Sequence, residues 1–373
     1  MKASLSTFNH ETAVQMQRRV TWMLDTITQN RRLLTVMKVA CTKHCLSVAT
    51  FLFAATFLLL GCKRSAPEDQ ITLYSGRNQH LLAPLLAQFT EETGIRVQTR
   101  YGGTSELAAT ILEEGKRSPA DVFFAQDAGA LGALSSAHIF RALPREIQES
   151  VPSAFRSQQG YWVGSSGRAR VLIYNTTRVQ EENLPASLAE LAEPQWRERV
   201  GWAPLNASFQ AFVTALRVER GDSATRDWLE AMSRNRPRSY ARNTAIVQAV
   251  AAGEIDIGLT NHYYLHTMQR DQGVSLQARN HIPREGTLIN VAGVGVLKTT
   301  RRPEQAEQFV RFLLSAQAQE FFTNETFEYP LVPSVDPNPA LPRLDALPIA
   351  EWDLSLLEDL QGTLVLLQEL EIL

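Results

Sequence analysis

Cysteine is nearly absent from this chain of 373 residues. The three cysteines, Cys41, Cys45 and Cys62, all precede residue 63. The remainder therefore has no thiol for a disulfide or a thiolate metal site. The length is sufficient for two domains, and 44% hydrophobic with 20% charged residues is an ordinary globular composition. We expect stability to come from buried apolar cores rather than from crosslinks.

An excess of positive charge is absent after residue 61. Residues 1–61 contain 7 Lys or Arg and 2 Asp or Glu; of the totals of 37 and 39, this leaves 30 and 37, a net charge of −7. Such an acidic chain gives no electrostatic reason to expect nucleic-acid binding. HExxH, P-loop and GxSxG motifs are missing, as is any visible nucleophile or paired acid and base. We therefore do not expect an enzyme.

One uncharged run stands out near the beginning of the chain. Residues 46–61 carry no charge and follow Lys38 and Lys43. A basic segment before a short apolar core is typical of a secretory signal, whereas a bilayer-spanning helix needs roughly 20 residues. An uncleaved membrane anchor is the alternative. We interpret residues 37–61 as a signal peptide and residues 1–36 as an over-extended start or a leader.

The end of this run, Leu59-Leu60-Gly61-Cys62, resembles the bacterial lipobox. The resemblance implies cleavage before Cys62 and attachment of a diacylglyceryl group to its sulfur. The mature protein would then be lipid-anchored to the cell membrane, facing the periplasm or the cell exterior. Residues 62–70 would serve as a short tether.

From residue 71 onward, apolar patterning alternates between strand and helix. The spacing predicts strands at 71–74, 95–101 and 120–124, with helices at 80–92 and 106–114 between them. This order indicates parallel βαβ units and an α/β fold. Further predicted strands are 168–174, 200–202, 255–259 and 288–297, and further helices are 209–219, 224–233, 244–252, 303–314 and 317–323.

Polar loops follow several of these strands. Open parallel sheets bind ligands at the carboxyl ends of their strands, where loops 75–80, 125–127 and 260–264 lie in this sequence. Loop 204–208 leads into a helix N-terminus, whose backbone N–H groups suit an anion. We therefore expect the ligand site to form from these four loops.

At these loops the sequence resembles the ferric-iron-binding proteins of ABC importers. The matching segments are ITLYSGRNQH, TEETGIRVQTRYG, EEGKRSPADVFFAQDAGALGAL, VAAGEIDIGLTNHYYLH, LINVAGVGVLKTT and EYPLVP. The resemblance implies a two-lobed type II periplasmic binding fold, in which two crossover strands join two α/β domains around an interlobe cleft. It places lobe one at 71–168 plus 293–335, and lobe two at 169–292 plus 336–373.

The adjacent tyrosines Tyr263 and Tyr264 are the most diagnostic element of this resemblance. Phenolate oxygen is a good ligand for a hard cation such as ferric iron, and a coordinated cation removes the phenolic proton readily. Neighbouring residues of a regular strand point to opposite faces, so both can reach one ion only if the chain turns there. The alternative is one tyrosine in the core and one at the surface.

Other metal ligands follow from the resemblance alone. Some family members have a His or Glu in the loop after the first strand, which makes His80 a candidate; a surface position at the helix start is the equal alternative. Gln126 stands where others carry Glu, and its amide oxygen is a weaker, uncharged ligand. Phe209 stands where others carry a further Tyr. These departures leave the coordination number open.

The resemblance also implies an anion, carbonate or phosphate, that completes the iron shell. A helix N-terminus with amide donors suits an oxyanion, and helix capping is the alternative for Asn206 and Asn243. The matching positions are Asn206, Ala207, Ser208, Asn243, Asn261, Asp127 and Arg77.

We therefore expect an exported monomer that captures Fe3+ and delivers it to an ABC permease and its ATPase. A second hypothesis keeps the fold but replaces iron with a small oxyanion, phosphonate or cationic metabolite. A third hypothesis is an extracytoplasmic enzyme or a ligand-reporting sensor. An enzyme should show a catalytic constellation, and none is visible; a sensor would show as a loss of signalling without a loss of uptake.

Overall fold

The structure is a computed structural model that describes residues 70–373 apart from residues 286 and 348–352. The predicted leader, signal peptide, lipidation site at Cys62 and most of the tether lie outside the described residues. Among those that are described, none of the helices combines the length and the apolar character needed to cross a membrane.

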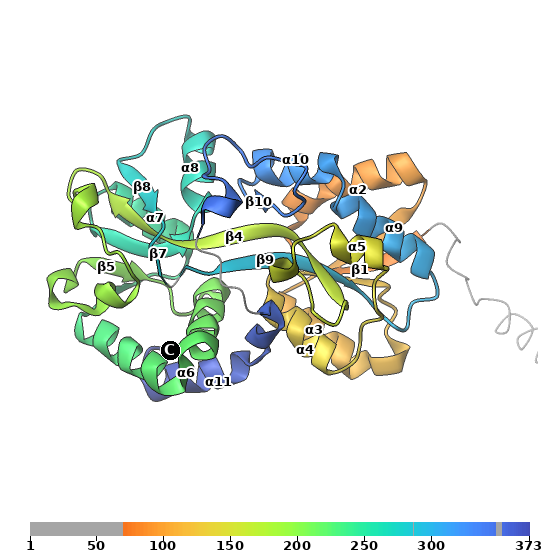
Figure 1. Ribbon diagram of the computed structural model, residues 1–373, viewed down its shortest axis with the longest axis horizontal. Helices are drawn as coiled ribbons and strands as arrows, with labels where there is room; N and C mark the ends of the chain where they lie inside the picture. The colour runs from red at the N-terminus through yellow and green to blue at the C-terminus, as the bar shows by residue number, and fades with distance from the viewer. Residues whose placement is uncertain (1–69, 286, 348–352) are drawn as a thin grey trace, which may run out of the picture. The chain divides into compact units, whose positions relative to one another are not determined.

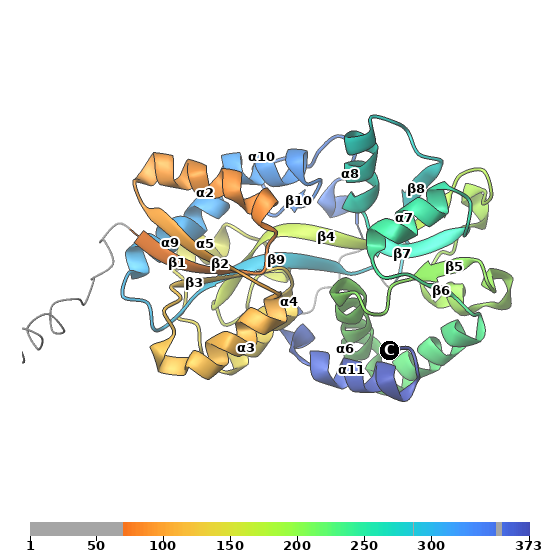
Figure 2. The same ribbon diagram turned by 180° about the vertical axis from the view of Figure 1, so that it is seen from behind.

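The first part of the sheet contains three parallel strands, as the βαβ pattern predicts. Strand β1 (Gln70–Ser75) pairs in parallel with β2 (Arg96–Tyr101) and with β3 (Val122–Ala125). Helices α2, α9 and α10 lie on one face, and α3 and α4 on the other (Figures 1 and 2). The helices of this part are α2 (Gln79–Thr93), α3 (Thr104–Glu114), α4 (Ala128–Ser136), α5 (Arg145–Glu149), α9 (Pro303–Leu313) and α10 (Ala316–Glu325).

The second part of the sheet repeats this arrangement. Strand β5 (Val200–Trp202) pairs in parallel with β6 (Arg238–Ser239) and with β7 (Ile257–Asn261). Helices α7 (Asn243–Ala251) and α8 (Tyr263–Gln272) lie on one side, and α6 (Ala207–Arg234) and α11 (Leu360–Glu369) on the other (Figure 1). The two helices predicted at 209–219 and 224–233 are both within α6, which is interrupted at Gly221 (φ 82°, ψ 164°).

Strand β4 (Trp162–Asn175) runs through both parts of the sheet, and β9 (Ile289–Val296) lies beside its first half. Strand β4 is buried along its whole length. It pairs antiparallel with β9 from Trp162 to Ala169, and then with β7 from Arg170 to Tyr174. Strand β8 (Ala278–His281) and the short β10 (Tyr329–Pro330) also pair with β4. Strand β9 also pairs with β3, and the chain passes from β8 in the second part of the sheet to β9 in the first. The chain therefore crosses between the two parts of this two-lobed α/β fold along β4 and again on its way into β9.

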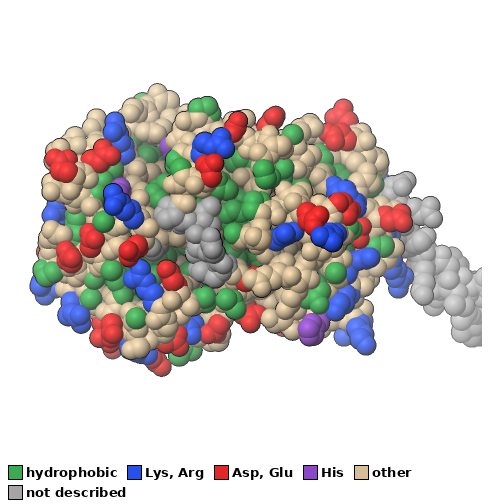
Figure 3. Space-filling model, in the orientation of Figure 1, with side chains coloured by type: hydrophobic (Ala, Val, Ile, Leu, Met, Phe, Trp, Pro, Cys, Tyr) green, Lys and Arg blue, Asp and Glu red, His purple; other side chains and the backbone are tan. Residues whose placement is uncertain are grey.

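Separate hydrophobic cores define the two lobes. The core of the first lobe lies around β1, β3 and β9 and contains Phe89, Phe123 and Trp162. The second lobe has one cluster around Trp202, Phe212 and Trp228, and another around α7. Acidic and basic side chains are interspersed over the face shown in Figure 3.

The C-terminal tail is divided between the lobes, which differs from the predicted boundary at residue 336. Four leucines of the tail pack in the first core: Leu341, Leu347, Leu354 and Leu357. The 3₁₀ helix Leu354–Glu358 lies against α4, where a Cβ on Gly132 would be 2.3 Å from the carbonyl oxygen of Ser355. This close approach requires glycine, so the backbone of the tail is fitted to the first lobe.

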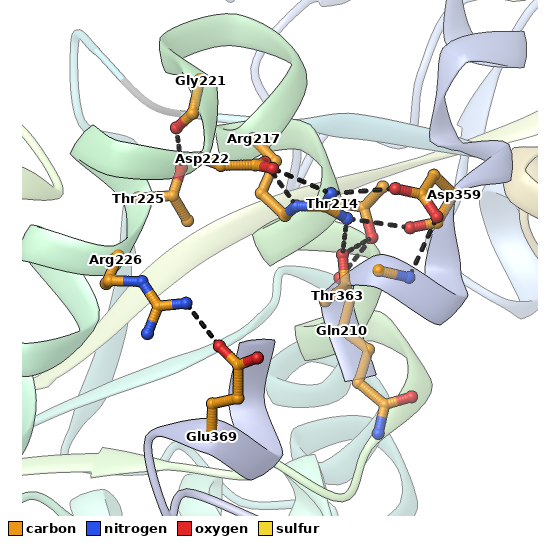
Figure 4. A network of polar contacts seen from close by, with 11 residues as sticks. Gln210, Thr214, Arg217, Gly221, Asp222, Thr225, Arg226, Asp359, Thr363 and Glu369 are labelled. Carbon is orange, nitrogen blue, oxygen red and sulfur yellow. Dashed lines mark hydrogen bonds and ion pairs between the residues drawn. The ribbon is translucent and has the colours of Figure 1, made fainter. Parts of the chain in front are cut away.

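The end of the tail belongs to the second lobe. Helix α11 buries Leu366 and Leu367 in the second core. Figure 4 shows its polar contacts with α6: Asp359 accepts from Arg217 at 2.8 Å, and the hydroxyls of Thr214 and Thr363 are 2.8 Å apart. The tail is therefore a third connection between the lobes, in addition to β4 and β9.

Replacement of Leu367 by Ala tests the packing of α11. Leu367 is fully buried, so Leu367→Ala should lower the free energy of unfolding by about 2–5 kcal/mol through lost burial and a cavity. Val365 is on the same helix but 43% exposed, so Val365→Ala should change it by less than about 0.5 kcal/mol. Urea denaturation measures both, and equal effects would contradict this packing.

Candidate functional site

The N-termini of α4, α6 and α8 meet at a cavity of about 160 Å³ between the lobes. Each helix begins directly after the carboxyl end of a strand or its loop, as the doubly wound pattern predicts. A helix N-terminus carries a positive partial charge and unpaired N–H groups, which favour anions. The side chains that line the cavity are Gln126, Asp127, Arg168, Arg170, Asn206, Ala207, Ser208, Asn261, Tyr263, Tyr264, Leu288 and Asn290.

The tyrosine pair occupies the first two positions of α8. Strand β7 ends at Asn261, and α8 begins at Tyr263. Because the chain turns here, the opposite-face constraint of a strand no longer applies. Both rings line the cavity, are partly buried, and have centroids 4.2 Å apart. The two phenols therefore lie close enough to contact one small ligand.

Ionisation of Tyr263 is costly in the absence of a cation. Burial is the main cause that raises the pKa of Tyr263 well above its usual value of 10, and the neighbouring Tyr264 raises it further. The Arg168 guanidinium opposes this shift without cancelling it. At neutral pH the phenol is protonated, so a ligand that needs phenolate must displace the proton.

Arg168 and Arg170 are the principal site residues that the sequence analysis missed. They are 5% and 2% exposed. Arg170 donates to the Leu259 carbonyl at 3.1 Å and to Ser208 Oγ at 3.3 Å. The Nε atoms of both arginines lack a hydrogen-bond partner among the described residues. Alternation along β4 could have identified them, because residues two apart in a strand share one face.

These arginines make the cavity wall positive. Burial lowers the pKa of Arg170 to about 9, which leaves the guanidinium charged at neutral pH. No salt bridge to a carboxylate is found for Arg168 or Arg170 within the described chain. The nearby carboxyl of Asp127 is partly buried, and loss of solvent contact raises its pKa, although the Ala130 N–H and Arg168 act in the opposite direction. Buried charge of this kind calls for an anionic partner.

A network of amides and a hydroxyl lies at the start of α6. Asn206 caps the helix by accepting the Ser208 N–H at 3.0 Å. The Asn243 amide donates to Ser208 Oγ at 2.9 Å and to Asn206 Oδ1 at 3.3 Å. Asn243 is buried and does not line the cavity or cap α7, whose N-cap is Arg242. Its contacts hold Asn206 and Ser208 in place instead.

Asn261 and Asn290 are held at the cavity by their partners. Asn261 ends β7, and its Oδ1 accepts from Arg170 at 3.4 Å. Asn290, which sequence reasoning did not identify, lies on β9 and accepts the Ala128 N–H at 3.1 Å. It thereby fixes the start of α4 next to the crossover strand.

Besides Asn243, two predicted residues are not at the cavity wall. Arg77 is buried in a two-bond ion pair with Glu328, with both N–O distances at 3.0 Å, and also donates to Gln126 Oε1 at 3.0 Å. His80 lies exposed in the first turn of α2, where Asn78 accepts its backbone N–H. Gln126 and Asp127 do line the cavity, at the end of β3 and the N-cap of α4.

Ordinary metal-binding clusters are not found in the part of the chain that the structure describes. No group of three or more His, Cys, Asp or Glu side chains there is placed to hold a metal ion. The paired phenols are thus the strongest anionic ligands that the cavity can supply, together with Asp127. The chemistry of the site is that of a small, highly charged ligand held between lobes.

Fold and site together define a two-lobed solute-binding protein. Residues 117–355 match the family of bacterial extracellular solute-binding proteins. The chain is 32% identical over 314 residues, or 83% of its length and 92% of the relative, to the Fe(3+)-binding periplasmic protein of Serratia marcescens. It is 37% identical over 274 residues, 71% of its length and 82% of the relative, to the major ferric iron-binding protein of Neisseria meningitidis. The chain belongs to this family of bacterial extracellular solute-binding proteins.

Solved structures agree with the sequence relatives. Iron-bound HitA from Pseudomonas aeruginosa superposes with a TM-score of 0.74 at 32% identity, covering 81% of this chain and 99% of that one. The Trichodesmium protein in complex with iron and citrate has a TM-score of 0.70 at 31% identity, with the same coverage. These likenesses confirm the two-lobed α/β fold and the family resemblance seen in the sequence.

Alkaline titration tests the environment of Tyr263. Because its pKa is raised, its phenol should stay protonated in the folded, metal-free protein at about pH 11, where exposed tyrosines ionise. Ultraviolet difference spectra should therefore count the same number of tyrosinates in the wild type and in Tyr263→Phe at that pH. When both proteins are unfolded in denaturant at the same pH, the wild type should gain one more tyrosinate than the variant. One tyrosinate fewer in the folded variant would refute the raised pKa.

Proposed function

We propose that this chain is the exported component of an ABC importer that captures ferric iron. The observation that carries the proposal is the tyrosine pair, whose rings lie 4.2 Å apart at the wall of an interlobe cavity. Relatives that share a third of its sequence are named as ferric iron-binding proteins. Iron is the cargo, and lobe closure over it is the expected motion.

Phenolates from Tyr263 and Tyr264 would be the principal ligands. Ferric iron favours oxygen donors, and its charge lowers the pKa of a coordinated hydroxyl. The raised pKa of Tyr263 means that binding releases a proton, so affinity should increase with pH. Weakly acidic conditions would correspondingly favour release.

An oxyanion would accompany the iron. Two buried guanidiniums repel a bare cation. An anion placed between them and the metal would instead be attracted by the guanidiniums and by the metal. Carbonate or phosphate could accept from Arg168 and Arg170, whose Nε atoms have no partner in the described part of the chain, and from the N-terminus of α6. Asn206, Ser208 and Asn261 lie around the same wall.

The remaining predicted ligands are secondary in this proposal. Gln126 Oε1 is already an acceptor from Arg77, so Gln126 would act at the rim rather than as a principal ligand. Arg77 supports that rim through its ion pair with Glu328. His80 stays a prediction, because its exposed position on α2 contributes to the cavity only after a rearrangement.

Export and delivery complete the proposal. We infer anchoring through Cys62, transfer of iron to a membrane permease with its ATPase, and a monomeric state. We also propose that the protein is not an enzyme. Among the described residues, Ser208 is the only Ser, Thr or Cys that lines the cavity, and its hydroxyl bonds amides and Arg170 rather than a general base.

The first test is the visible spectrum of the ferric complex. Residues 62–373 with Cys62→Ser, stripped with chelator and given ferric citrate, should form a coloured one-to-one complex, because phenolate bound to ferric iron absorbs visible light. Tyr263→Phe and Tyr264→Phe should each bleach or shift the band. Tyr101→Phe is the control, since Tyr101 lies on β2 outside the cavity. A colourless wild type that binds phosphate instead would establish the alternative cargo.

The second test concerns the anion. In carbonate-free, phosphate-free buffer, restoring either anion should strengthen iron binding by the wild type. In Arg170→Gln, the anion should strengthen the free energy of iron binding by about 1.5–3 kcal/mol less than in the wild type, which is the contribution of a hydrogen bond to a charged group. Arg100→Gln, which removes a half-exposed guanidinium on β2, should retain it. An unchanged anion dependence in Arg170→Gln would contradict the proposed anion site.

A further inference from the structure

Both ring nitrogens of His262 form hydrogen bonds, although this residue does not line the cavity that contains Tyr263 and Tyr264. It is 2% exposed. Nδ1 accepts the Ala169 backbone N–H at 3.1 Å, and Nε2 lies 2.7 Å from the Phe327 carbonyl oxygen. Since Nδ1 accepts, the ring proton is on Nε2, which donates to Phe327. The ring is thus a neutral bridge between two backbone segments.

The first segment is the crossover strand at its change of partner. Ala169 is the last β4 residue that pairs with β9, and Arg170 is the first that pairs with β7. The His262 N–H donates to the Ala169 carbonyl at 3.0 Å, so His262 engages both backbone polar groups of Ala169. Ala169 also lies between Arg168 and Arg170, the two guanidiniums of the cavity.

The second segment belongs to the first lobe. Phe327 follows α10 with a positive φ of 55°, a conformation that a bulky residue adopts only when its surroundings impose it. The next residue, Glu328, is fixed by its buried ion pair with Arg77. The following ring, Tyr329, lies 4.7 Å from the His262 ring. This segment is therefore rigidly attached to the first lobe.

The backbone of His262 starts the helix that carries the tyrosine pair. His262 is the N-cap of α8, directly before Tyr263. Its carbonyl oxygen accepts from the Asn280 amide at 2.8 Å, which ties the same residue to β8 of the second lobe. One residue thus contacts β4, the first-lobe segment after α10, the second-lobe strand β8 and the start of α8.

We propose that His262 is a positioning residue that couples the tyrosine pair to the hinge between the lobes. A rotation of the lobes acts on β4 and on the Phe327 segment, and the imidazole transmits both to the start of α8. The phenols are thereby held in the orientation that binds iron when the lobes close. The inference rests on the proposed function, because it assigns a role in the same site.

Three substitutions separate the two arms of the bridge. In His262→Asn, Oδ1 takes the place of Nδ1 and retains the bond from Ala169. In His262→Gln, Nε2 takes the place of the ring Nε2 and retains the bond to Phe327. His262→Ala removes both. The matched control is His281→Ala, which removes a part-buried imidazole that bonds the Pro185 carbonyl at 2.9 Å within the second lobe.

The readouts are the ferric–tyrosinate band and the rate of iron release to a chelator. His262→Ala should shift or weaken the band and accelerate release by roughly 10- to 100-fold, as the loss of a group that orients a ligand does. His262→Asn and His262→Gln should each give a smaller change, and His281→Ala none. Bands and rates within about twofold of wild type in all three His262 variants would overturn the proposal.

Hydrogen exchange at the Ala169 amide provides a readout without metal. In folded His262→Ala, exchange at this amide should accelerate, whereas His262→Asn should keep it protected. If His262→Ala does not fold, the iron band and the release rate of His262→Asn and His262→Gln test the proposal in its place. A wild type without an iron band would defeat the proposed function. Unchanged exchange at Ala169 in the alanine variant would overturn the present inference independently.

Discussion

The hydrogen-bond ladder of β4 is the constraint on which both lobes depend. Its residues pair with β9 as far as Ala169 and with β7 from Arg170 onward, so one strand belongs to both parts of the sheet. A backbone buried along its whole length must have its N–H and C=O groups paired. The partner change at 169–170 therefore fixes where the lobes separate, and it places the cavity directly beside that point.

The same location explains the electrostatics of the site. Alternation along β4 directs Arg168 and Arg170 to one face, and both line the cavity. Neither guanidinium forms a salt bridge with a carboxylate among the described residues, and burying charge in this way costs free energy unless an anion compensates it. The tyrosine pair and three helix N-termini surround these charges. The site thus favours an anionic ligand, and the proposed iron would bind through phenolates that form by ionisation of the tyrosine pair.

The tail adds a constraint that the family resemblance does not suggest. The segment 354–358 is fitted against α4, and α11 is packed on α6 with Leu366 and Leu367 in the second core. A two-lobed protein that closes on its ligand must move this connection together with β4 and β9. The Arg217–Asp359 ion pair lies where the tail passes from one lobe to the other.

The sequence alone determined the local elements and most of the cavity. Period-two and period-3.6 patterns predicted β1 to β3, α2, α3 and α7, and the loops at strand ends contained Gln126, Asp127, Ser208 and the tyrosine pair. These features are local, because hydrophobic periodicity and turn residues act over a few positions. The family resemblance supplied the expectation that these loops line one cleft between two lobes.

The tertiary structure alone decided the partners of the charged and polar groups. Arg77 is in an ion pair with Glu328, 251 residues away, whereas Arg168 and Arg170 face the cavity. Asn243 supports Ser208 rather than capping α7, and the tail joins both lobes. The turn before Tyr263 placed both phenols on one wall. Such outcomes depend on contacts between residues far apart in the chain, which neither local propensity nor periodicity encodes.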